Sequence, residues 1–190
     1  MIPIEIILGV SALILAVAGI AQIRFTGPKG NAQKVDVNFA RDKALKLSQA
    51  LYAVGRSDDQ AYFAKGLPAV LNEFGRYQKV LGDAAKYARY KAGAIQKRLG
   101  QIYQKYIQNF KREYARPIME EASSWDTASK EIGMVLGEAS QMSIAAEAYG
   151  KGVIPVGQAQ ALSKQILSHY GQEYRINSQL NDLRSRMSLK

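Results

Sequence analysis

The sequence predicts an all-α protein in which an N-terminal transmembrane helix is followed by long helices that form an antiparallel hairpin or bundle. Residues 2–23, IPIEIILGVSALILAVAGIAQI, are apolar except for one glutamate, one serine and one glutamine. From residue 68 to residue 116, apolar or small residues recur about every 3.7 positions, which is a helical period. Strand-like alternation is absent from that run, which is rich in Ala, Lys, Gln and Arg.

Residues 1–25 are predicted to be a membrane anchor. About 20 apolar residues in a helix cross a hydrocarbon core of roughly 30 Å. A cleaved signal peptide would need basic residues before a shorter apolar stretch, and a buried core helix is the other alternative. Arg24, Lys29 and Lys34 flank the membrane on the C-terminal side of this segment. The positive-inside rule therefore places the N-terminus outside and the rest of the chain in the cytoplasm or a virion interior.

A turn-rich linker at 26–35 precedes a single helical domain, 36–190. Asp36 is the expected N-cap of its first helix, which runs to about Val54 and ends at a glycine. The Ser-Asp-Asp sequence at 57–59 is expected to cap a short helix that ends near Lys65.

A Gly-Leu-Pro sequence at 66–68 is expected to break that short helix and to place Pro68 in the first turn of a long one. The long basic helix, about 68–116, would be roughly 70 Å long. Its four internal glycines, at 75, 82, 93 and 100, fall on similar faces of the helix. They indicate either a close contact with another helix or simple tolerance of curvature.

Two further helices complete the predicted domain. An acidic helix covers about 117–149, beginning at Pro117, and a C-terminal helix covers about 158–187. A glycine- and proline-containing break at 150–157 separates them. Short connections of this kind favour antiparallel neighbours.

The positive charge of the chain is concentrated in the long helix. The formal net charge is +10, and residues 76–116 carry eleven basic and two acidic side chains. Residues 117–149 carry one basic and six acidic side chains. Ion pairs between the two helices are one explanation for this pattern, and contact with a phosphate backbone is the other. The two explanations are compatible, because the acidic helix carries too little charge to cancel the basic one.

Seven residues of the basic helix are predicted to contact phosphates without reading base sequence. They are Lys86, Arg89, Lys97, Arg98, Lys105, Lys111 and Arg112. Six tyrosines are interleaved with these charges and either stack on the bases of a single strand or pack against neighbouring helices. They are Tyr77, Tyr87, Tyr90, Tyr103, Tyr106 and Tyr114.

The sequence contains no arrangement that predicts an enzyme. It has no cysteine and a single histidine, His169, so no zinc-type metal site is expected. Glycine-rich phosphate-binding motifs and paired carboxylates at catalytic spacing are also absent. We therefore expect no catalytic residues, no cofactor and no small-molecule substrate.

The stretches IEIILGVSALILAVAGIAQI and GQAQALSKQILSHYGQEYRINSQL resemble in composition the internal and membrane-associated virion proteins of phages, including DNA-ejection and pilot proteins. The resemblance implies a non-enzymatic structural protein that oligomerises, inserts residues 2–23 into a lipid bilayer and contacts DNA non-specifically. This resemblance in composition assigns no function to any individual residue. The alternative is a cellular single-pass envelope scaffold, or a subunit of a larger membrane complex, that binds an acidic partner or anionic lipid.

Overall fold

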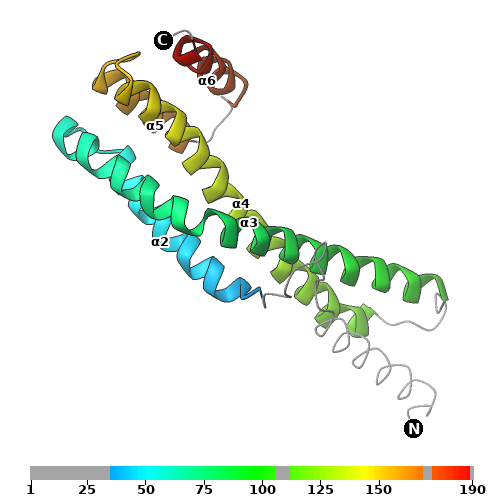
Figure 1. Ribbon diagram of the computed structural model, residues 1–190. Helices are drawn as coiled ribbons and strands as arrows, with labels where there is room; N and C mark the ends of the chain where they lie inside the picture. Colours follow the sequence, from blue (N-terminus) through cyan, green and yellow to red (C-terminus); the bar gives the residue numbers. More distant parts are fainter. Residues whose placement is uncertain (1–34, 106–111, 169–172, 189–190) are drawn as a thin grey trace, which may run out of the picture. The chain divides into compact units, whose positions relative to one another are not determined.

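The computed structural model describes residues 35–105, 112–168 and 173–188, and within these ranges every element is a helix (Figure 1). The helices are α2 (Val37–Gly55), α3 (Gln60–Lys105), α4 (Arg112–Gly150), α5 (Val156–Ser168) and α6 (Glu173–Ser188). The predicted all-α class is confirmed.

The predicted anchor and linker, residues 1–34, lie outside the described residues, as do the membrane-flanking Arg24, Lys29 and Lys34. No helix in the described part of the chain is long and apolar enough to cross a membrane. The anchor therefore stays a prediction from the sequence.

Helix α2 begins and ends within one residue of the predicted bounds. The turn after it carries the predicted cap of the next helix: the Asp59 carboxylate accepts hydrogen bonds from the backbone N–H groups of Ala61 (2.8 Å) and Tyr62 (3.1 Å). A carboxylate in this position satisfies two of the N–H groups that a helix start leaves without helical partners.

The predicted break at residues 66–68 is wrong, because α3 runs without interruption from Gln60 to Lys105 and contains Pro68. Pro68 is exposed, so its ring points to solvent, although it removes one helical hydrogen bond. Phe63, Leu67 and Phe74 are buried on both sides of it. Their burial favours a continuous helix over the local break that the Gly-Leu-Pro sequence indicates.

Two other predicted boundaries also differ. Helix α4 begins at Arg112 and contains Pro117, which was expected to begin the helix. The single C-terminal helix predicted for 158–187 appears as two described helices, α5 and α6, and residues 169–172 between them lie outside the described part. Pro117, the sixth residue of α4, is exposed and removes one helical hydrogen bond, while the burial of Ala115 and Ile118 beside it favours a continuous helix.

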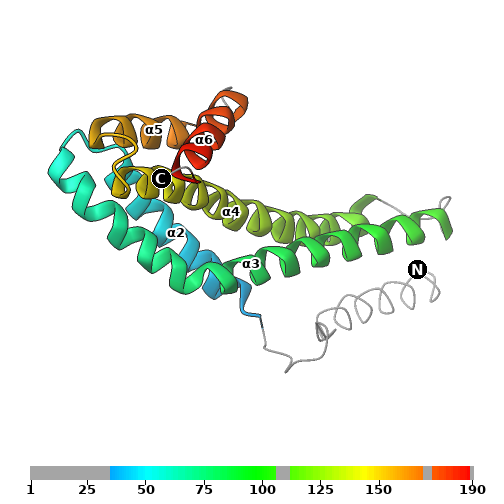
Figure 2. The same cartoon turned by 45° about the horizontal axis from the view of Figure 1, so that its top comes forward.

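The described helices divide into two compact units, and α3 and α4 each contribute residues to both. The first unit includes Asp83–Lys130, and the second contains Asn38–Gly82 and Glu131–Lys190. Within the second unit, α2 lies antiparallel along the first part of α3 (Figures 1 and 2). The largest fully buried side chains of the second unit include Leu51, Phe63, Leu67, Ile132, Met142, Ile166 and Leu167.

The first unit is an antiparallel pair formed by the second part of α3 and the first part of α4. The Ser129 hydroxyl donates to the backbone carbonyl of Ala85 (2.9 Å). Farther along the pair, Ile95 of α3 is buried in one cluster with Ile118 and Ala122 of α4. The predicted antiparallel pairing of the basic and acidic helices is therefore present in this unit.

The four glycines of α3 singled out from the sequence do not mark a close helix contact. A Cβ atom built on Gly75, Gly82, Gly93 or Gly100 would meet nothing within 4 Å. The glycine with the closest neighbours is instead Gly55, where a Cβ would lie 2.6 Å from a Leu167 methyl group. The close-contact interpretation of the four α3 glycines is thus wrong, and these positions are open.

Candidate nucleic-acid interface

In the first unit, α3 has a packed face and an exposed face. Ala84, Ala88, Ala92 and Ile95 are buried at the three- and four-residue spacing of one helical face. Lys86 and Lys97 lie about half a helical turn away from this seam, Arg89 lies about a third of a turn from it, and all three are exposed. We call these three residues the basic face of α3.

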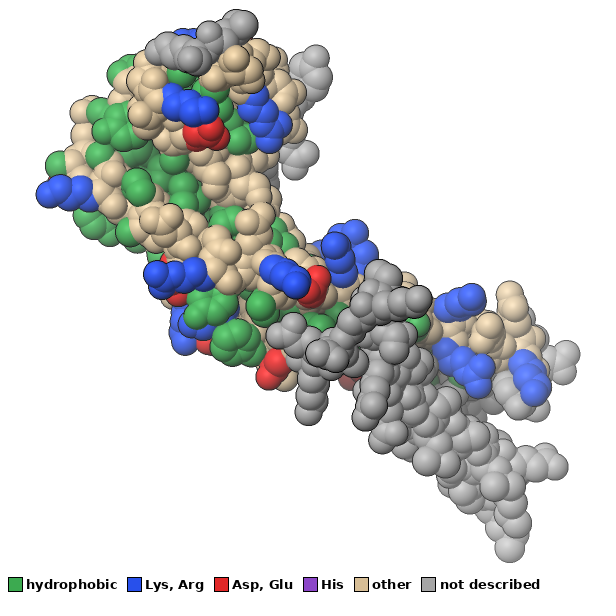
Figure 3. Space-filling model, in the orientation of Figure 1, with side chains coloured by type: hydrophobic (Ala, Val, Ile, Leu, Met, Phe, Trp, Pro, Cys, Tyr) green, Lys and Arg blue, Asp and Glu red, His purple; other side chains and the backbone are tan. Residues whose placement is uncertain are grey.

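Five of the seven predicted phosphate-contact residues are described as exposed. Besides the three of the basic face, Arg98 and Lys105 lie on its flank, and Arg98 donates to the side chain of Gln101 (3.4 Å). Lys111 lies outside the described residues. Arg112 is the first residue of α4, and its side chain is not described. In Figure 3, Lys and Arg side chains gather over this part of the helix pair.

Four carboxylates of α4 form ion pairs with cations that do not belong to the basic face of α3. Three of them pair with a base four residues away in sequence: Glu120 with Arg116 (2.9 Å), Asp126 with Lys130 (2.6 Å) and Glu147 with Lys151 (2.8 Å). In the second unit, Glu131 accepts two hydrogen bonds from Arg41 of α2, one of them at 3.0 Å. Asp126, Glu131 and Glu147 therefore pair with cations outside the predicted basic helix. Arg116, the partner of Glu120, was predicted to end the basic helix but lies in α4.

One basic residue of α3 belongs to the packed face, and it was not identified from the sequence as a buried residue. Lys91 is only 4% exposed, and its Nζ lies 5.7 Å from the ring centroids of both Tyr87 and Trp125. Burial lowers the pKa of Lys91, and attraction by Glu121 partly opposes that shift. Lys91 lies three residues from Ala88 and four from Ile95, and this spacing was the available signal that it faces α4.

The tyrosines interleaved with the basic residues differ in their surroundings: two of them pack against other aromatic rings and one is exposed. Tyr87 is half-buried and stands edge-on to Trp125, with ring centroids 6.1 Å apart. Tyr77, in the second unit, contacts the Phe39 ring and has the Lys43 ammonium 4.7 Å from its centroid. Tyr90 is 48% exposed, on the same side of α3 as the basic face. Tyr106 lies outside the described residues, and the side chain of Tyr114 is not described.

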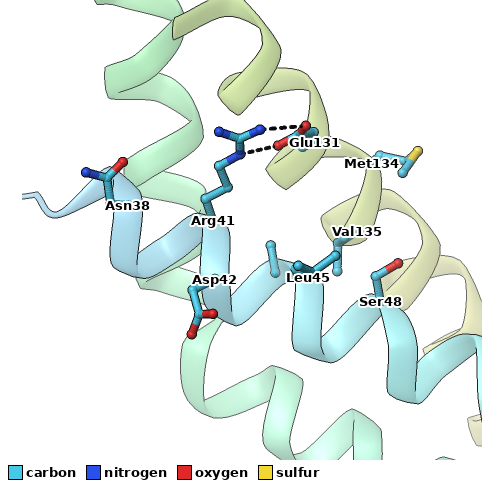
Figure 4. A pocket seen from close by; sticks show the side chains of 9 residues that line it. Asn38, Arg41, Asp42, Leu45, Ser48, Glu131, Met134 and Val135 are labelled. Carbon is cyan, nitrogen blue, oxygen red and sulfur yellow. Dashed lines mark hydrogen bonds and ion pairs between the residues drawn. The ribbon is translucent and has the colours of Figure 1, made fainter. Parts of the chain in front are cut away.

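The second unit has a separate hollow of about 460 Å³ between α2 and α4. Figure 4 shows Arg41 reaching across it to Glu131, with Leu45 and Val135 beside it. Arg41, the cation that lines this hollow, donates from its Nε and one terminal nitrogen to both oxygens of Glu131, so its charge is directed at a carboxylate.

A buried polar group also lies in the second unit. Glu138 of α4 is buried, and the Tyr52 hydroxyl of α2 donates to the backbone carbonyl of Leu167 in α5 (3.2 Å). Burial raises the pKa of Tyr52, Glu138 raises it further, and Arg56 opposes both. This arrangement links three helices and is enclosed by the core, so it has the character of a structural element.

Within residues 35–105, 112–168 and 173–188, no group of three or more acidic or histidine side chains is placed to hold a metal ion. His169 lies outside these ranges. The candidate site in the described chain is the basic face of α3, where three exposed cations lie on one side of the helix.

Replacing Lys91 with methionine is expected to raise the unfolding free energy at pH 7 by about 1 kcal/mol, because it removes a desolvated ammonium from the interface. In the native protein the pKa of Lys91 is below its ordinary value of 10.5, so the unfolded chain binds more protons between those two values. The contribution of Lys91 to stability therefore rises with pH as 10.5 is approached from below. Urea unfolding from pH 7 to pH 10 should show this rise in the wild type and a flatter profile in the variant.

Lys97→Met is the matched control for this prediction, since Lys97 is exposed on the same helix. It should keep the pH profile of the wild type. A Lys91→Met protein that is less stable than the wild type and has the same pH profile would show that the ammonium is not desolvated in solution.

No protein-family model matches this chain, and no curated protein or solved structure matches it either.

Proposed function

We propose that this protein is a non-enzymatic, membrane-anchored structural protein whose basic α3 face contacts the phosphate backbone of nucleic acid, in the manner of the phage virion proteins that its composition resembles. The observation that carries the proposal is the position of Lys86, Arg89 and Lys97. All three are exposed, Lys86 and Lys97 opposite the packed seam and Arg89 to one side of it, while four carboxylates of α4 lie against other cations. Such charges bind a polyanion by releasing its condensed counterions.

The membrane part of the proposal rests on the sequence. Residues 2–23 have the length and apolarity of a span, and Arg24, Lys29 and Lys34 follow it. This orientation would place the basic face on the cytoplasmic or virion-interior side, where nucleic acid is found. Assembly of several copies would then align several basic faces along one strand or duplex.

The test compares two triple variants of the full chain in mild detergent. The first variant carries glutamine in place of Lys86, Arg89 and Lys97. The second variant carries glutamine in place of Lys46, Lys130 and Lys151. Each variant loses three positive charges, but the control lysines lie in ion pairs with acids four residues away. Fluorescence anisotropy with labelled DNA should show affinity weakened at least about tenfold in the first variant at low salt.

The control variant should bind within about twofold of the wild type, because its lysines are already paired with carboxylates. Equal losses in the two variants would show that only net charge matters, and would contradict a defined interface on α3. Binding to anionic vesicles but not to DNA would favour the alternative, a membrane scaffold that contacts anionic lipid.

A further inference from the structure

The basic face of α3 includes an exposed aromatic ring. Tyr90 is 48% exposed and follows Lys86 by four residues, which places the two side chains on neighbouring turns of one helix face. Lys97 lies two turns farther along the same face. Tyr87, one turn earlier, has its ring against Trp125 and is not part of this surface. Of these two tyrosines, Tyr90 is therefore the one that a ligand on the basic face can reach.

The surface next to Tyr90 is open down to the helix backbone. Gly93 lies three residues after Tyr90, and a Cβ built on it would meet nothing within 4 Å. Any larger residue at this position would place side-chain atoms beside the Tyr90 ring, because residues three apart are neighbours on a helix. Glycine is unfavourable inside a helix. At position 93 it lowers the helix propensity and leaves space beside the Tyr90 ring.

We propose that Tyr90 stacks on a base of single-stranded nucleic acid while Lys86, Arg89 and Lys97 bind the neighbouring phosphates. This inference rests on the proposed function and adds the form of nucleic acid that the site prefers. Single strands present unstacked bases to an aromatic ring, and stacking accepts every base because each has a π-face. A duplex keeps its bases stacked inside and offers only phosphates to this face. The site should therefore favour a single strand over a duplex of equal length.

The experiment measures the affinity of the full chain in detergent for an oligothymidine of about 15 nucleotides and for a duplex of the same length. Tyr90→Leu removes the aromatic ring and keeps an apolar side chain. We expect it to weaken single-strand binding at least about fivefold and to leave duplex binding within about twofold. Tyr90→Phe keeps the ring and should bind like the wild type. Gly93→Leu should also weaken single-strand binding, because it occupies the space beside the ring.

Tyr62→Leu is the matched control, since Tyr62 is 49% exposed on the same helix but belongs to the second unit. It should leave both affinities unchanged. Far-ultraviolet circular dichroism should be the same for all four variants, because every substituted position is on the helix surface or open.

The outcomes separate this inference from the proposed function. A Tyr90→Leu protein that binds single strands as tightly as the wild type overturns stacking, while the charge-dependent binding of the basic face stands. Equal losses for the single strand and the duplex also overturn it, because stacking is confined to the single strand. A wild-type protein that binds neither form overturns both proposals.

Discussion

Truncation of Phe63 to alanine is expected to lower the unfolding free energy by about 3–5 kcal/mol. Phe63 lies near the start of α3 and is the largest of the fully buried side chains described in the second unit. Its removal takes apolar area out of the core and leaves a cavity that α2 and α3 fill only in part. Urea unfolding of the full chain in detergent, followed by circular dichroism, measures the loss.

The neighbouring residue provides the control for this prediction. Tyr62 is 49% exposed, so Tyr62→Ala should change the unfolding free energy by less than about 1 kcal/mol. Similar losses in the two variants would contradict the register of α3 in the second unit, because adjacent residues on a helix point in different directions.

Replacing Pro68 with alanine is expected to raise the unfolding free energy by about 2 kcal/mol. Proline inside a helix is about 3 kcal/mol less favourable than alanine, and Pro68 is the ninth residue of α3. The substitution also frees the unfolded chain, which offsets roughly 0.4–1 kcal/mol of that gain. Because Pro68 is exposed, alanine at this position leaves the core unchanged. Urea unfolding of the wild type and the variant under identical conditions gives the difference.

Pro155→Ala serves as the comparison, because Pro155 lies just before α5 and its carbonyl accepts the backbone hydrogen bond from Gln158 (3.1 Å). This variant should be slightly less stable than the wild type, since proline there restricts the unfolded chain without disturbing a helix. A destabilised Pro68→Ala protein would show that the chain breaks at residues 66–68 in solution, as its glycine and proline indicate.

The sequence predicts the helices of this protein well where their ends are marked by local chemistry. The bounds of α2 follow from an aspartate before its start and a glycine at its end, and Asp59 caps α3 as expected. These signals act over one helical turn and depend on neighbouring residues only.

The errors at Pro68 and Pro117 have a physical cause that local signals do not contain. A proline ends a helix unless burial on both sides outweighs the lost hydrogen bond. Phe63, Leu67 and Phe74 supply that burial around Pro68, and Ala115 and Ile118 supply it around Pro117. Propensity alone therefore predicts a break where tertiary packing favours a continuous helix.

The candidate site was predicted in composition but not in detail. Charge counts located the excess on α3, and the exposure of Lys86, Arg89 and Lys97 agrees with that expectation. The same counts included Lys91 without distinguishing it from the exposed bases, although its spacing places it on the packed seam with Trp125. Tyr90 was also one of several equivalent tyrosines until the packing of Tyr87 distinguished the two.

The partners of the acidic residues were the least accessible to prediction. The bidentate pair of Arg41 and Glu131 joins residues 90 positions apart. The single contact between the Lys164 ammonium and the Asp58 carboxylate joins residues 106 positions apart. Such pairs depend on which helices become neighbours, which the charge pattern of one helix does not specify. Net charge per segment predicted pairing between the acidic helix and the basic helix, whereas Asp126 and Glu147 pair with a base four residues away and Glu131 pairs with Arg41 of α2.

The salt dependence of DNA binding tests the central claim most directly. The slope of log affinity against log salt concentration counts the phosphates that the protein neutralises, at about 0.9 for each contact on a duplex. If Lys86, Arg89 and Lys97 each contact a phosphate, the glutamine variant of all three should have a slope shallower than that of the wild type by about 2 to 3. The control variant of Lys46, Lys130 and Lys151 should keep the wild-type slope. Identical slopes in all three proteins would contradict a nucleic-acid interface on the basic face of α3.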